Sequence, residues 1–115
     1  MEKVNGIGGF FFRSDNPESL KEWYATHLGM QFPIWSQDAG PTVIAPFSQS
    51  SDYFAAEKQW MLNLRVSNLD AMIQQLKDAG IKVITDPEWN SEAGRFARIH
   101  DPEGNALELW EPPQD

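Results

Sequence analysis

The segment from Ile99 to Trp110 constrains the fold of this chain more than any other. Its centre reads Asp101-Pro102-Glu103-Gly104-Asn105, in which the aspartate opens a tight turn, the proline presets φ and the glycine accepts a left-handed conformation. Apolar and β-branched residues flank the turn on both sides. This pattern predicts a β-hairpin.

The side chains of this hairpin divide into two different faces. If the strands pair symmetrically about Glu103, the facing pairs are His100 with Ala106, Arg98 with Glu108, and Phe96 with Trp110. Because side chains alternate across a strand, these six share one face, and the other face is purely apolar: Ala97, Ile99, Leu107 and Leu109. We expect the apolar face in the core. The first face has the mixture of rings and charges that is typical of a pocket wall.

The size and charge of the chain exclude several classes of protein. A chain of 115 residues is long enough to bury roughly two thirds of its unfolded surface, and without cysteine it has no disulfide, thiolate nucleophile or cysteine-ligated metal. Its net charge of −8 repels phosphate backbones and anionic lipids, so we expect neither a nucleic-acid nor a membrane partner. No segment has the apolar length of a signal peptide or membrane span, which favours a cytoplasmic protein.

Local sequence signals predict the same order of elements twice. The first half has an apolar run over residues 7–13, a helix from Asn16 to Gly29, and two strands over 30–36 and 42–47. The second half has a strand over 60–66, a helix over 69–79, a strand over 81–85 and then the hairpin. Arg13 and Arg65, 52 residues apart, occupy equivalent positions before the two helices. We therefore predict one α+β domain over residues 1–115, in which two βαβββ modules, about 1–57 and 58–115, form a curved mixed sheet around a cavity.

Alternation along the two leading strands adds further residues to each face. The core side takes Ile7, Gly9, Phe11, Leu62, Leu64 and Val66, and the cavity side takes Gly8, Phe10, Phe12, Met61, Asn63 and Arg65. Aromatic walls with a few convergent polar groups are typical of a small-molecule site. The alternative is that the rings of the five tryptophans and seven phenylalanines are simply core and scattered surface.

The chain resembles the vicinal oxygen chelate superfamily, which groups glyoxalase I, extradiol dioxygenases, epimerases, fosfomycin-resistance transferases and bleomycin-binding proteins. The likeness is most specific in the Asp101–Asn105 turn and the Glu108-Leu109-Trp110-Glu111 strand that follows it. The Asp15-Asn16-Pro17 helix start and the two helix ends, Leu28-Gly29 and Ala79-Gly80, add to it. The resemblance implies paired βαβββ modules and a homodimer.

In metal-dependent members of that superfamily, His or Glu side chains of the leading and last strands hold zinc, nickel, manganese or iron. Glu108 matches a last-strand ligand, whereas the leading-strand positions hold Gly8 and Met61, which do not suit these ions. The remaining ligand would lie between Thr42 and Glu57, where Asp52 and Glu57 are the only acids. We therefore predict no metal cofactor, and we expect Arg98 to pair with Glu108 in place of the ion.

Two functions follow from these features. The first is a metal-free protein, similar to the bleomycin-binding branch, whose aromatic cavity holds a small planar or carbonyl-bearing molecule. Its contacts would come from Phe10, Phe12, Met61, Asn63, Arg65, Phe96, Arg98, Glu108 and Trp110. The second is a divalent-metal-dependent lyase, isomerase or dioxygenase of the glyoxalase type that uses Glu108 as ligand or base.

Several of these residues have an ordinary structural interpretation beside the functional one. If the chain is an enzyme, the candidates for catalysis are Glu108, Arg98 and His100, but a histidine beside a turn is equally a rim residue. Arg65 fits both a ligand anchor and a solvated strand end. Trp110 fits both a stacking platform and a dimer interface.

Overall fold

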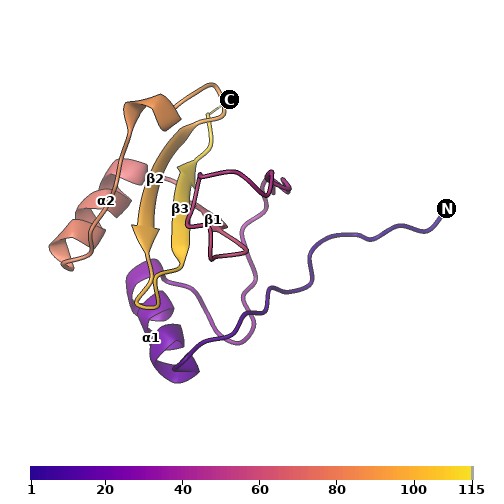
Figure 1. Ribbon diagram of the computed structural model, residues 1–115, viewed down its shortest axis with the longest axis horizontal. Coiled ribbons are helices and arrows are strands. Elements are labelled where there is room, and N and C mark those ends of the chain that lie inside the picture. Colours follow the sequence, from indigo (N-terminus) through magenta and orange to yellow (C-terminus); the bar gives the residue numbers. More distant parts are fainter. Residues whose placement is uncertain (115) are drawn as a thin grey trace.

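The computed structural model describes residues 1–114 as a small α+β fold with one mixed sheet, which confirms the predicted fold class (Figure 1). Its elements are α1 (Pro17–Leu28), β1 (Leu62–Arg65), α2 (Leu69–Asp78), the short 3-10 helix η1 (Pro87–Trp89), β2 (Arg95–His100) and β3 (Ala106–Glu111). The strand order is β1-β3-β2, in which β3 runs parallel to β1 and antiparallel to β2.

The β2–β3 hairpin has the predicted register. Arg98 pairs with Glu108, Phe96 with Trp110, and His100 with Ala106. Gly104 has a φ of 80°, the left-handed conformation that the turn requires. The alternation is confirmed as well, since Ala97, Ile99, Leu107 and Leu109 have no exposed surface.

Both helices begin and end where their capping residues predict. The side chains of Asn16 and Asn68 accept backbone N–H groups at the starts of α1 and α2, and Pro17 occupies the first turn of α1. Gly29, with a φ of 69°, ends α1 in the left-handed conformation. The helix ends therefore follow signals that lie within about one turn of each end in the sequence.

The core lies between the helices and the apolar face of the sheet. Leu20 and Tyr24 of α1, and Leu69 and Leu76 of α2, pack against the buried strand residues. Leu62, Leu64 and Val66 join this cluster as predicted. Figure 1 shows α2 along the sheet and α1 beside the hairpin turn, so the opposite face is left to the connecting segment between α1 and β1.

The strands expected in the first half are not formed among the described residues. Residues 7–13, 30–36 and 42–47 contain no strand, and the N-terminal segment runs away from the sheet (Figure 1). Ile7 and Phe11, expected in the core, are 64% and 93% exposed. An apolar run becomes a strand only when another strand offers it backbone partners, and this segment has none among residues 1–114. The expected strand over 81–85 is reduced to a bridge between Ile84 and Arg98.

None of the helices in residues 1–114 has the length and apolar character to cross a bilayer.

Candidate ligand-binding site

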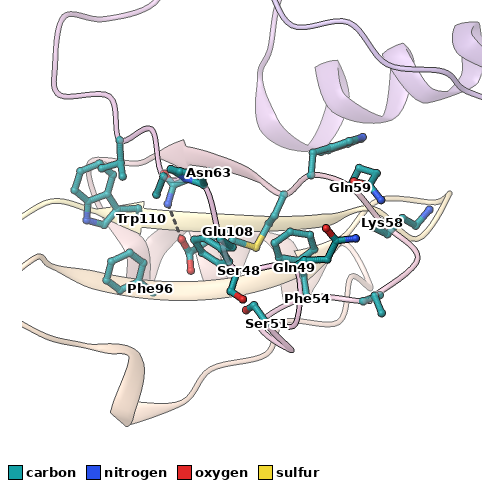
Figure 2. A pocket seen from close by; sticks show the side chains of 18 of the residues that line it. Ser48, Gln49, Ser51, Phe54, Lys58, Gln59, Asn63, Phe96, Glu108 and Trp110 are labelled. Carbon is teal, nitrogen blue, oxygen red and sulfur yellow. Dashed lines mark hydrogen bonds between the residues drawn. The ribbon is translucent and has the colours of Figure 1, made fainter.

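A pocket of about 720 Å³ lies on the polar face of the sheet (Figure 2). The strands supply one wall through Asn63, Phe96, Glu108 and Trp110, and Met61, just before β1, adds to it. The segment over residues 43–60 supplies the other wall, with Phe47, Ser48, Gln49, Phe54, Lys58 and Trp60 among its lining side chains. The pocket thus has aromatic and polar side chains on the sheet wall and both apolar and polar side chains on the loop wall. This composition is typical of small-molecule sites.

Phe96 and Trp110 form a stacked aromatic pair in the lining of this pocket. Their rings are parallel within 3°, with centroids 6.3 Å apart, as expected for cross-strand partners. The Trp110 indole N–H donates to the carbonyl oxygen of Ala93 at 2.8 Å, which fixes the orientation of the ring. Gly94 lets the backbone lie this close to Trp110 and Glu111. It has a φ of 129°, and an added Cβ would lie 2.3 Å from the backbone oxygen of Glu111 and 2.7 Å from Nε1 of Trp110.

Glu108 is a buried acid whose two carboxylate oxygens both accept hydrogen bonds. Asn63 donates its amide N–H to Oε1 at 2.8 Å, and the Tyr53 hydroxyl donates to Oε2 at 2.5 Å. Asn63 comes from the neighbouring strand, where it is the register partner of Glu108 (Figure 2). The carboxylate therefore faces the pocket as a hydrogen-bond acceptor.

The expected ion pair between Arg98 and Glu108 is wrong. Arg98 donates from Nη1 to the backbone oxygen of Tyr53 at 3.0 Å, and no ion pair among residues 1–114 joins it to Glu108. Its guanidinium carbon lies 4.7 Å from the centre of the Tyr53 ring and 5.4 Å from that of Trp89. The guanidinium thus lies over two aromatic rings, a contact that is favourable for a planar cation. Glu108 instead accepts hydrogen bonds from two uncharged groups, an amide and a phenol.

Arg98 is not among the residues that line this pocket, and three other predicted site residues also lie outside it. Phe10 and Phe12 pack against Trp60, each with ring centroids 5.0 Å apart, and line a separate hollow of about 210 Å³ beside α1. Arg65 donates to the backbone oxygens of Asp38 and Ala39, so it holds the connecting segment. A role in binding for these three residues stays a prediction.

His100 lies exposed at the end of β2 and is not among the residues that line the pocket. Partial burial and then the charge of Arg98 lower its pKa below the usual 6.5, so the imidazole is neutral at pH 7. Its expected catalytic role stays a prediction.

The residues around Glu108 do not fit a divalent metal. The superfamily often uses such ions, and catalytic sites usually present three protein ligands. Residues 1–114 contain no group of three or more histidine, cysteine or acidic side chains that could hold one. Gly8 lies in the exposed N-terminal segment, and the neighbours of Glu108 are an amide and a phenol rather than imidazole or a second carboxylate.

Tyr53 is the site residue that the sequence interpretation missed. It follows the polar segment Ser48–Asp52, which reads as an ordinary surface loop. The adjacent aromatic pair Tyr53-Phe54 was the available signal, since two rings at the end of a polar loop are expected to return to the protein. The region over residues 42–57, in which a further metal ligand was expected, instead brings a phenol to Glu108.

Comparisons with solved structures identify proteins of the same fold. TnmS3, an antibiotic binding protein from Streptomyces sp. CB03234, superposes with a TM-score of 0.67 and 23% identity over 98% of this chain and 100% of its own. A glyoxalase/bleomycin resistance protein from the same organism gives 0.53 and 25%, over 84% and 92% of the two chains. Oxidase ChaP-H2 gives 0.54 and 21%, over 87% of each chain. A search of curated proteins found no match.

A family model supplies the assignment. It is described as the Glyoxalase/Bleomycin resistance protein/Dioxygenase superfamily and matches residues 6–109, nearly the whole chain. The fold, the hairpin turn and the family match therefore agree, and the chain belongs to the Glyoxalase/Bleomycin resistance protein/Dioxygenase superfamily.

Proposed function

We propose that this protein binds a small planar molecule that carries a carbonyl group, and that it does so without a metal ion. The observation that carries the proposal is the parallel Phe96–Trp110 pair on the wall of a pocket of about 720 Å³. Aromatic rings in the wall of a pocket favour a flat aromatic ligand, because ring–ring contacts add to the free energy of burial. The side chains of Gln49 and Lys58, which line the same pocket and can donate hydrogen bonds, would orient the carbonyl oxygen of that ligand.

The comparisons support a binding function at the level of the fold. A fold neighbour, TnmS3, is described as an antibiotic binding protein. The donor set around Glu108 supports the metal-free part of the proposal, since an amide and a phenol complete the hydrogen bonding of the carboxylate. Stoichiometric zinc, nickel, manganese or iron in protein purified without chelator, lost in Glu108→Ala, would instead favour the glyoxalase-type enzyme.

The binding proposal is tested with 2-acetonaphthone, a flat aromatic ketone, by fluorescence titration. We expect saturable binding to the wild type and a dissociation constant about fivefold higher in Phe96→Leu, since an aromatic pair contributes about 1 kcal/mol. Phe32→Leu is the matched control, because Phe32 is 41% exposed and is not among the residues that line the pocket. Equal affinities in the wild type and Phe96→Leu would contradict the stacking role.

We also propose that the protein acts as a homodimer. Its first half exposes many large apolar side chains, including Val4, Ile7, Phe11, Ile34, Val43 and Ile44, each at least 64% exposed. Exposed apolar groups in such number favour a protein interface. The division into modules near residue 57 and the cytoplasmic location stay predictions.

A further inference from the structure

Tyr53 contacts two neighbouring charged side chains of the sheet, Arg98 and Glu108, of which Glu108 lines the pocket and Arg98 does not. Its hydroxyl donates to Glu108 Oε2 at 2.5 Å, and its backbone oxygen accepts from Arg98 Nη1 at 3.0 Å. Its ring also lies 4.7 Å from the guanidinium carbon of Arg98. Arg98 and Glu108 are register partners on adjacent strands, yet one tyrosine occupies both of them.

The Arg98 side chain has hydrogen-bonding capacity that this tyrosine does not use. Arg98 is only 8% exposed, and its Nε and Nη2 atoms have no partner among residues 1–114. Buried N–H groups normally find an acceptor, because water can no longer satisfy them. Arg98 therefore has the donors for an additional oxygen atom.

Glu108, the other charged residue that Tyr53 contacts, already accepts a hydrogen bond from the Tyr53 phenol. Burial, followed by the hydrogen bond to Glu108, raises the pKa of Tyr53, so the hydroxyl is a protonated donor at neutral pH. Tyr53 itself comes from the loop wall, where its ring packs on Phe47 with centroids 5.6 Å apart. Tyr53 is only partly buried and does not belong to the hydrophobic core. Movement of its side chain would therefore change the loop wall but not the core.

We propose that Tyr53 occupies the position of the ligand's own phenol, and that the pocket selects flat phenols that carry a carbonyl oxygen at the far end of the ring system. In the bound state Tyr53 moves aside, the ligand hydroxyl donates to Glu108, and the carbonyl accepts from the free donors of Arg98. Tyr53 offers the same two kinds of group, its phenol to Glu108 and its backbone carbonyl oxygen to Arg98. This inference rests on the proposed binding function and specifies its ligand class.

The experiment compares three naphthyl ketones at pH 6.5 by fluorescence titration: 6-hydroxy-2-acetonaphthone, its 6-methoxy ether and 2-acetonaphthone. The methoxy ether keeps the ring and carbonyl but cannot donate to Glu108. We expect the hydroxy compound to bind the wild type about tenfold more tightly than the ether, the effect of one hydrogen bond to a charged group. In Glu108→Gln this preference falls to less than about threefold, since the acceptor has lost its charge.

Substitution of Tyr53 tests the competition itself. Tyr53→Phe keeps the ring but removes the hydrogen bond to Glu108, so the occupied state is less populated and all three ketones bind about threefold more tightly. Ser50→Ala is the control, since it removes an exposed hydroxyl from the same segment at a residue that does not line the pocket. We expect it to leave the dissociation constants unchanged.

Three outcomes would overturn the inference, and they are distinguishable. Equal affinity of the wild type for the hydroxy compound and its ether would exclude selection of a phenol. Unchanged or weaker binding by Tyr53→Phe would show that Tyr53 is an ordinary contact rather than a competitor. If none of the ketones binds the wild type or Tyr53→Phe, the proposed function fails together with the inference, whereas the first two outcomes leave it standing.

Discussion

At the scale of single residues, two acids of the hairpin have different tasks although they lie close in sequence. Glu108 faces the pocket, whereas Asp101 is 4% exposed and holds the turn together. Its Oδ1 atom accepts the backbone N–H groups of Glu103 and Asn105, and its Oδ2 atom accepts from the side chains of Asn105 and Tyr24. The aspartate that opens the turn is therefore structural, and the acid on the following strand is the one available to a ligand.

The hydrogen bond between Tyr24 and Asp101 is expected to contribute measurably to stability. It is 2.7 Å long and buried, and burial together with this bond raises the pKa of Tyr24, so the phenol remains a donor over the accessible pH range. Tyr24→Phe should lower the free energy of unfolding by about 1 to 3 kcal/mol, because it leaves a buried carboxylate with one donor fewer. Urea denaturation measures this change.

A double-mutant cycle of Tyr24→Phe with Asp101→Asn separates the bond from other effects of each substitution. Because the two side chains are in direct contact, the cycle should show a coupling free energy of at least about 0.5 kcal/mol. Additive effects of the two substitutions would contradict the proposed contribution of the bond.

At the scale of elements, the hairpin turn fixes the start of α1. Glu103 accepts hydrogen bonds from the Ser14 hydroxyl at 2.6 Å, and from the backbone N–H groups of Asp15 at 3.0 Å and Asn16 at 3.4 Å. The turn of the second half of the chain thereby supplies acceptors that the first helix start would otherwise seek in water. A carboxylate at this position also complements the positive end of the helix dipole.

The contact between Glu103 and α1 predicts a pH dependence of stability. The hydrogen bond from Ser14, followed by that from Asp15, holds the pKa of Glu103 below its usual 4.5. A lowered pKa means that the unfolded chain binds this proton more tightly, so the contribution is present above pH 4.5 and is lost as the pH falls through the folded-state value. The melting temperature of the wild type should therefore fall more steeply with acidification below this pH than that of Glu103→Gln.

Glu2→Gln is the control for this comparison, because Glu2 lies in the exposed N-terminal segment. Its melting temperature should follow the wild-type pH profile. Parallel profiles for the wild type and Glu103→Gln would show that the contact makes no pH-dependent contribution.

At the scale of the whole molecule, the sequence predicted what depends on neighbours along the chain. Asn16, Gly29 and Asn68 act within one turn of helix, and the hairpin register depends on a tight turn and strict alternation. The prediction of a strand over residues 7–13 was wrong, because a strand needs a pairing partner and no local sequence pattern specifies one. Tyr53 was missed for a related reason: the path of a loop across a sheet face is decided by tertiary packing.

The exposed apolar side chains of the first half lead to a prediction about assembly. Sedimentation equilibrium should give twice the mass of the chain, since burial of these side chains against a second copy is favourable by about 25 cal/mol for each Å² removed from water. Phe11→Ser should shift the equilibrium toward the monomer, because Phe11 is 93% exposed in the single chain. A wild-type mass equal to one chain at all concentrations would contradict the dimer.

The most direct test of the binding pocket is a crystal structure with bound 2-acetonaphthone. Our account predicts electron density for the naphthalene rings against Phe96 and Trp110, with the Glu108 carboxylate facing the same cavity. Density for the ligand in the hollow beside α1 instead, lined by Phe12 and Tyr24, would contradict it. So would a metal ion coordinated by Glu108.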